Sequence, residues 1–171
     1  MKVWIIRGLL LATAIAVIAQ QPRTLPTPAQ GINNNLRSVN RRVLEMAKDF
    51  PADKYDYRPN KDVRSFGEVV LHVMAGNTYA AKTAHGENAN WDKEEVDPKT
   101  YKGKDQIVAA FQKSVDDVTD AVQKLPPDQF NKTLAPYLAV IEHAGEHYGQ
   151  LVVYYRLNGM VPPASRPQPK K

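Results

Sequence analysis

The sequence predicts an all-α protein folded as a four-helix bundle. Four segments carry apolar residues at the three- and four-residue spacing of an amphipathic helix, and proline, glycine or a capping signal bounds them. No strand-like alternation or internal repeat competes with this interpretation. With 171 residues, the chain has room for one domain with a substantial core.

The N-terminal segment, residues 1–19, is typical of a secretory signal peptide. Lys2 and Arg7 precede an apolar run that ends in small residues, with Val17 and Ala19 at the −3 and −1 positions of a cleavage site. The run is shorter than a membrane-spanning helix requires, although an uncleaved N-terminal anchor stays open as an alternative. We therefore expect an exported protein, either periplasmic or secreted.

The first two helices have local boundary signals. Apolar residues recur at helical spacing between Gly31 and Phe50, and a proline follows. Ser65 and Glu68 have the S-x-x-E form of a capping box, so the second helix should begin at Ser65 and fade near Gly86.

The second pair of helices follows a long connection. Residues 87–104 are polar and charged, and they exceed the length of a bundle turn, which predicts a crossover. A third helix is expected over 105–125, and a fourth from about Leu134 or Pro136 to Leu157, where an Asn-Gly pair supplies the C-terminal signal. The predicted order is a signal peptide over 1–19, a linker over 20–30, the bundle over 31–161 and an extended tail over 162–171.

Composition narrows the range of functions. The chain has no cysteine, which excludes disulfides and thiol chemistry by the protein itself. Without Lys2 and Arg7 the formal charge falls from +5 to +3, and no block of like charges remains. Nucleic-acid binding is therefore not expected.

Helical geometry separates one of the four histidines from the other three. His143 and His147 lie one turn apart on the core-facing stripe of the fourth helix. His72, in the second helix, lies beside Gly76, whose small size leaves space near an inward imidazole. His85 falls on a different side of the second helix and should point elsewhere.

Three neutral imidazoles from two helices suit a site for zinc, nickel or a similar divalent ion. If one coordination position is open, such an ion can activate water near neutral pH or polarise a substrate oxygen. The alternative is that each histidine is a hydrogen-bonded core residue, because H-x-x-x-H pairs also occur by chance in helices. These residues alone leave both interpretations open.

The stretch from His143 to His147 also has the H-x-x-E-H spelling of an inverted zinc protease. The chain after His147 contains no Asp or Glu, so the downstream carboxylate ligand of such proteases is absent. We therefore reject a protease. Glu142 and Glu146 are expected to be solvated or to hold an imidazole in place.

Three motifs in this order resemble the DinB-like superfamily. Residues 51–59 match its P-A-D-x-Y-x-x-R-P turn before a histidine-bearing helix, here with His72. Residues 143–151 are similar to its H-x-x-x-H-R-G-Q-L helix, with Tyr148 in place of the arginine, and residues 156–163 match its R-x-x-G-x-x-P-P tail. The resemblance covers roughly residues 31–165.

The resemblance implies a metal site formed by His72, His143 and His147, commonly with nickel or zinc. It also implies up-down-down-up connectivity, which the long crossover fits. Some relatives are metal-dependent thiol transferases or isomerases, and many have no known activity. Family membership therefore indicates the site better than the reaction.

Two functions of different classes are compatible with such a site. The first is a metal-dependent hydrolase or thiol-transferase-like enzyme acting on a small molecule, with a phenol from Tyr79, Tyr148 or Tyr154 near the metal. Export favours hydrolysis, because cytosolic thiol cofactors are not expected outside the membrane. The second is a non-catalytic metal-binding or stress-associated bundle, in which the ion adds to the free energy of folding. A plain helical interaction domain without metal is a third reading.

The sequence also predicts the kinds of partner that the protein has. We expect a small-molecule substrate, no nucleic acid and no stable membrane insertion after signal cleavage, and a homodimer stays open.

Gly67, Gly76 and Gly149 lie inside predicted helices, where glycine costs about 1 kcal/mol relative to alanine. They serve either close helix packing or room for a substrate beside His72 or His147.

Overall fold

The computed structural model describes residues 25–167, in which helices are the only regular secondary structure. The predicted signal peptide lies outside the described residues. The helices are α1 (Pro28–Asp49), α2 (Phe66–Ala84), α3 (Gly103–Gln123), α4 (Pro127–Lys132) and α5 (Leu134–Leu157), with single 3-10 turns η1 (Ala52–Lys54), η2 (Trp91–Lys93), η3 (Pro98–Thr100) and η4 (Pro163–Ser165). The predicted all-α bundle is confirmed, and no helix in this part of the chain is long and apolar enough to cross a membrane.

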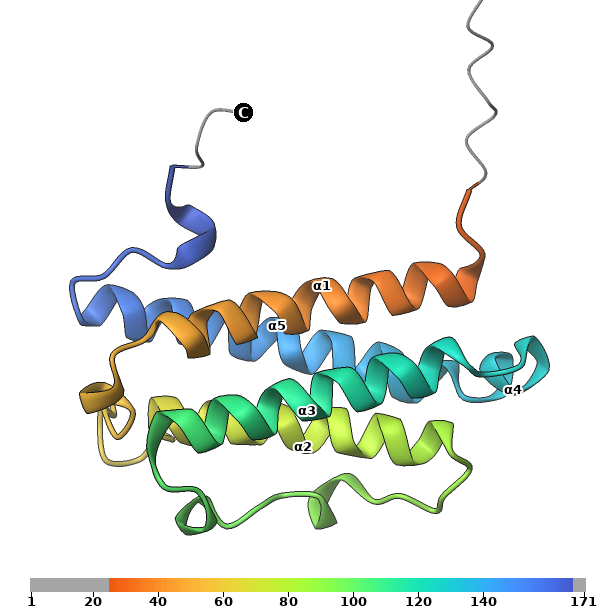
Figure 1. Cartoon of the computed structure of the whole chain (residues 1–171), viewed down its shortest axis with the longest axis horizontal. Coiled ribbons are helices and arrows are strands. Elements are labelled where there is room, and N and C mark those ends of the chain that lie inside the picture. Colours follow the sequence, from red (N-terminus) through yellow and green to blue (C-terminus); the bar gives the residue numbers. More distant parts are fainter. Residues whose placement is uncertain (1–24, 168–171) are drawn as a thin grey trace, which may run out of the picture.

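The four long helices form the bundle (Figure 1). Helices α1 and α5 run in one direction and α2 and α3 in the other, so the chain passes up, down, down and up. Residues 85–102 return along the bundle from the end of α2 to the start of α3. Helix α2 packs against α3 and α5, whereas α1 and α2 barely touch and lie diagonally opposite.

Helix α1 begins earlier than the sequence pattern indicated. Thr27 caps it, because the Thr27 side chain accepts a hydrogen bond from the Gln30 backbone and the Gln30 side chain accepts one from Thr27. This capping box extends the helix back to Pro28, inside the segment assigned to the linker. Helix α2 begins as predicted, with Ser65 and Glu68 forming its capping box.

The start of the segment that was predicted as a tail, residues 162–167, contains the turn η4 and contacts α1. Arg166 holds the Asp49 carboxylate at the end of α1, with Nη1 2.8 Å from Oδ1, and Tyr155 donates to the same carboxylate. The hydrogen bond from Arg166 is the main reason that the pKa of Asp49 lies below its usual value. The two-pronged contact between the Arg166 guanidinium and the Asp49 carboxylate thus holds the segment that includes η4 against the end of α1.

Two apolar clusters fill the bundle. One is centred on the stacked rings of Phe50 and Phe66, whose centroids are 3.8 Å apart, and the other contains Phe130 and Tyr137. Along α5, Val140 belongs to the second cluster and Leu151 to the first. The histidine pair on α5 therefore lies where the two clusters meet.

A buried polar cluster joins α1, α2 and α3. The side-chain amides of Asn40 and Asn77 exchange two hydrogen bonds of 3.0 Å, and Asn77 also donates to the Ser114 hydroxyl. Both asparagines are fully buried. Since each amide satisfies the other, the cluster fixes the helices against one another without leaving an unpaired polar group.

We expect Asn77→Ala to lower the free energy of unfolding by about 1–3 kcal/mol, because it leaves the buried Asn40 amide without its partner. Urea denaturation measures the change. The matched control is Asn34→Ala on the exposed face of α1, which should change stability by less than about 0.5 kcal/mol. Equal losses in the two variants would contradict a structural role for the Asn40–Asn77 pair.

Candidate metal centre

Helices α2 and α5 bring three histidines together at the half-buried face between them. Each of His72, His143 and His147 offers a nitrogen within 4.8 Å of those offered by the other two. The Nε2 atoms of His72 and His143 are 3.0 Å apart, and the three ring centroids are separated by 4.4 to 4.7 Å. His85 is the exposed C-cap of α2 and lies outside this group, as its helical phase indicated.

The stripe on α5 explains the position of two of the rings. Val140, Leu151 and Tyr154 are buried on the same stripe, so the packing of α5 turns His143 and His147 toward α2. His72 faces them from α2, whose other neighbours on that side are buried. The sequence pattern therefore placed these three side chains on the right faces.

The crossover and α5 orient two of the imidazoles. His72 Nδ1 contacts the carboxylate of Glu95, which can only accept, so Nδ1 carries the proton and Nε2 keeps its lone pair. His147 Nδ1 lies 2.7 Å from Gln150 Oε1, while the Gln150 amide nitrogen donates to Tyr154 Oη at 3.1 Å. His147 is therefore also held with its Nε2 lone pair free.

Burial keeps two of the three imidazoles, those of His143 and His72, neutral. It lowers the pKa of His143 to about 3, with further lowering by the neighbouring His147 and His72 and by the charge of Arg64. Burial also lowers the pKa of His72, although the Glu95 carboxylate partly opposes this. Neutral imidazoles present lone pairs rather than protons, which is the state that metal coordination requires.

This donor set fits a borderline divalent ion such as zinc or nickel. Two nitrogens bound to a tetrahedral ion at about 2.0–2.1 Å lie about 3.3 Å apart, which is close to the 3.0 Å between His72 Nε2 and His143 Nε2. Within residues 25–167, no carboxylate and no fourth histidine joins the group. Three protein ligands leave at least one position for water or substrate.

Sequence reasoning missed both residues that orient the rings. Glu142 and Glu146 were expected either to be solvated or to hold an imidazole in place; both are exposed, in agreement with the first alternative, and Glu95 and Gln150 contact the rings instead. Gln150 follows His147 by three residues on one helix face, so helical spacing could have indicated it. Glu95 had no comparable signal, because the crossover brings it to His72 from 23 residues away.

The three candidate phenols differ in their surroundings. The Tyr154 hydroxyl donates to the Arg64 carbonyl at 2.6 Å and accepts from Gln150, so it supports His147 indirectly. The Tyr148 ring lies 4.8 Å from the Arg42 guanidinium of α1. Tyr79 stacks on Trp91, and the edge of Trp91 in turn contacts His143.

The three glycines inside helices differ in how closely other residues pack against them. A Cβ on Gly76 would lie 2.8 Å from the Trp91 ring, and one on Gly67 would lie 3.1 Å from Ile107, so both serve close packing. The space beside Gly76 is therefore filled by Trp91 of the crossover. Gly149 faces open space on the exposed side of α5, away from any packed neighbour.

Comparison with known proteins identifies the family. The model of the DinB superfamily matches residues 35–151, a range that contains all three histidines together with Glu95 and Gln150. The chain therefore belongs to the DinB superfamily. The search of curated proteins gives no match.

We expect Gly76→Ala to destabilise the fold by about 1 kcal/mol or more, because the new methyl group forces Trp91 to move. Gly149→Ala is the matched control and should instead stabilise it by about 0.5–1 kcal/mol, through helix propensity alone. Urea denaturation of the two variants tests the pair. Stabilisation by Gly76→Ala would show that Trp91 is not packed against α2.

Proposed function

We propose that the protein is an exported DinB-like protein that binds a divalent metal ion, nickel or zinc, through His72, His143 and His147. The observation that carries this proposal is the convergence of three imidazoles whose nitrogens lie within 4.8 Å of one another, two of which are oriented through Nδ1 so that Nε2 is left for the metal. The match to the DinB superfamily supports it independently of the geometry.

The ion would make the site a centre for metal-dependent hydrolysis or thiol transfer on a small molecule. A bound divalent ion supplies Lewis acidity, which activates water near neutral pH or polarises a substrate oxygen. The chain itself contributes orientation: Glu95 and Gln150 hold two imidazole tautomers, and Trp91 covers one side of His143. The partial exposure of all three histidines leaves them reachable by a small molecule.

A non-catalytic metal-binding bundle is the second candidate, and the tyrosines favour it. Tyr154 is hydrogen-bonded on both sides, and Tyr148 is covered by Arg42. The Tyr154 phenol is therefore not free to act as an acid at the metal. In this alternative the ion mainly adds to the free energy of folding.

Export rests on the sequence of residues 1–19, where a basic start precedes a short apolar run. Export favours a hydrolase over a transferase that uses cytosolic thiols. N-terminal sequencing of protein recovered outside the cytoplasm tests export, since an unprocessed Met1 would contradict cleavage.

Elemental analysis of the purified protein tests the metal proposal. We expect about one nickel or zinc ion per chain, and a loss of that ion in His143→Ala, because one of three ligands is removed. His85→Ala is the matched control, since His85 is exposed and outside the group. Glu95→Gln should weaken metal affinity about 10–100-fold while leaving the ligand set intact. Metal-free wild-type protein, or equal metal content in the two histidine variants, would overturn the proposal.

Turnover decides between the two candidates. Metal-loaded protein is assayed on a panel of esters and thiol acceptors, with the same concentration of free metal and with His143→Ala as references. Hydrolysis or transfer above both references supports an enzyme. Metal bound at full stoichiometry without such turnover supports the non-catalytic bundle.

A further inference from the structure

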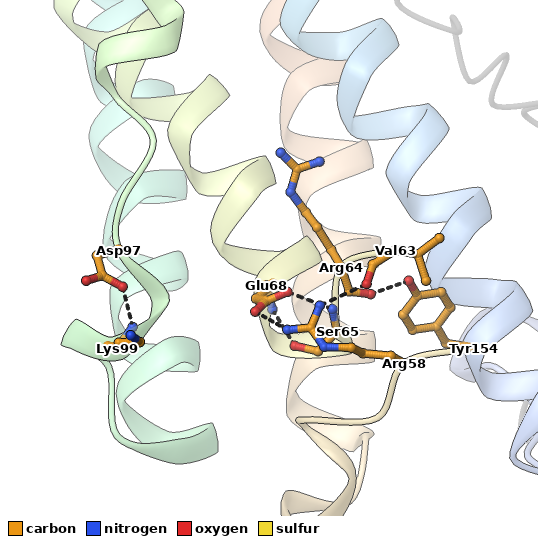
Figure 2. Close-up of polar contacts among 8 residues, drawn as sticks. All are labelled: Arg58, Val63, Arg64, Ser65, Glu68, Asp97, Lys99 and Tyr154. Carbon is orange, nitrogen blue, oxygen red and sulfur yellow. Dashed lines mark hydrogen bonds and ion pairs between the residues drawn. The ribbon is translucent and has the colours of Figure 1, made fainter. Parts of the chain in front are cut away.

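Arg64 directly precedes the N-cap of α2, and its side chain has an unusual position. In Figure 2 the side chain extends from the N-terminal end of α2 in the direction in which the helix runs, away from the contacts made by Arg58, Ser65 and Glu68. No dashed contact in Figure 2 reaches its guanidinium. Among residues 25–167, the Arg64 guanidinium forms no hydrogen bond or ion pair, so it does not hold two parts of the fold together.

The neighbouring carboxylate is already satisfied without Arg64. Glu68 accepts from the Arg58 guanidinium through Oε1 and from the Ser65 backbone through Oε2 at 2.9 Å. Arg58 also donates to the Val63 carbonyl at 2.8 Å, which fixes it in this arrangement. Glu68 is thus hydrogen-bonded to Arg58, whereas Arg64 acts on it only through its charge, which helps Arg58 and Ser65 to lower the pKa of Glu68 against the effect of burial.

A chain of hydrogen bonds ties Arg64 to the histidine group. The Arg64 carbonyl accepts from Tyr154 Oη, Tyr154 accepts from Gln150, and Gln150 holds His147. The backbone of Arg64 is therefore positioned relative to one imidazole of the group. Its side chain runs from the start of α2 along that helix (Figure 2), in the direction of His72, which lies two turns further on in α2. In keeping with this position, the charge of Arg64 adds to the effect of burial in lowering the pKa of both His72 and His143.

The Arg64 side chain is exposed, so a ligand from solvent can reach its guanidinium. The three histidines are the proposed binding site of a divalent cation. A nearby guanidinium repels this cation, because both carry positive charge. An anion between the two would be attracted by both. Guanidinium is also the group whose planar fork best matches a carboxylate or phosphate.

We infer that Arg64 anchors the oxyanion group of a small-molecule ligand whose other end reaches the three-histidine site, so that the site selects anionic substrates. This inference rests on the proposed metal site and adds the substrate class to it. Arg64 acts in it as a specificity-determining residue, while the histidines and their supports Glu95 and Gln150 remain unchanged.

The test compares two thiols that differ by one charge. Full-length protein is loaded with Co²⁺, whose visible spectrum changes when a thiolate binds, and is titrated with 3-mercaptopropionate and with its methyl ester. We expect wild-type protein to bind the acid about tenfold more tightly than the ester, as one charge-assisted contact provides. In Arg64→Gln that ratio should fall to about one, with the affinity for the ester unchanged.

Two variants sharpen the result. Arg64→Lys should keep part of the preference, because lysine retains the charge but not the planar fork. Arg37→Gln, which removes an exposed arginine of α1, should leave the ratio at its wild-type value. An unchanged ratio in Arg64→Gln, or equal binding of both thiols by wild-type protein, overturns the anchor while leaving the metal site intact. Failure of wild-type protein to take up Co²⁺ is a separate readout and overturns the metal proposal together with this inference.

Discussion

Three imidazole rings with centroids less than 5 Å apart share the space between α2 and α5, where they cannot all be charged at once. Two neighbouring imidazolium ions would repel one another in a half-buried place where water screens them poorly. Burial lowers the pKa of His143 to about 3 and also lowers the pKa of His72, which keeps these two rings neutral. The same constraint that prevents protonation leaves nitrogen lone pairs directed at one another, an arrangement that a divalent cation stabilises. The packing of α2 against α5 and the proposed chemistry therefore have a common origin.

The long crossover is part of this centre rather than a passive connection. Its topological role is to let α2 and α3 run in the same direction (Figure 1). It also supplies Glu95, which sets the tautomer of His72, and Trp91, which fills the space left by Gly76 and contacts His143. On the other side, Gln150 and Tyr154 connect His147 to the loop before α2. Two of the imidazoles are thus oriented by other side chains, His72 by Glu95 of the crossover and His147 by Gln150 of the next turn of α5, as is typical of metal-binding histidines.

The parts of this structure that local signals determine could be predicted from the sequence. The S-x-x-E box places the start of α2, and the spacing of His143 and His147 along an apolar stripe places both rings on the core side. The Thr27–Gln30 box at the start of α1 is equally local but lies in a proline-rich segment, which favoured a linker. Glu95 and the Asn40–Asn77 pair depend on which segments meet in space, so no spacing rule could identify them. Arg166 was missed for the same reason, since its partner Asp49 lies at the far end of the first helix.

X-ray absorption spectroscopy at the zinc or nickel edge of metal-loaded protein tests the central claim most directly, because it reports the ligands of the ion itself. The account predicts three imidazole nitrogens at about 2.0–2.1 Å, accompanied by at least one oxygen or other light atom. A shell of oxygen atoms without imidazole scattering, or a spectrum identical to that of the metal in buffer, would contradict it.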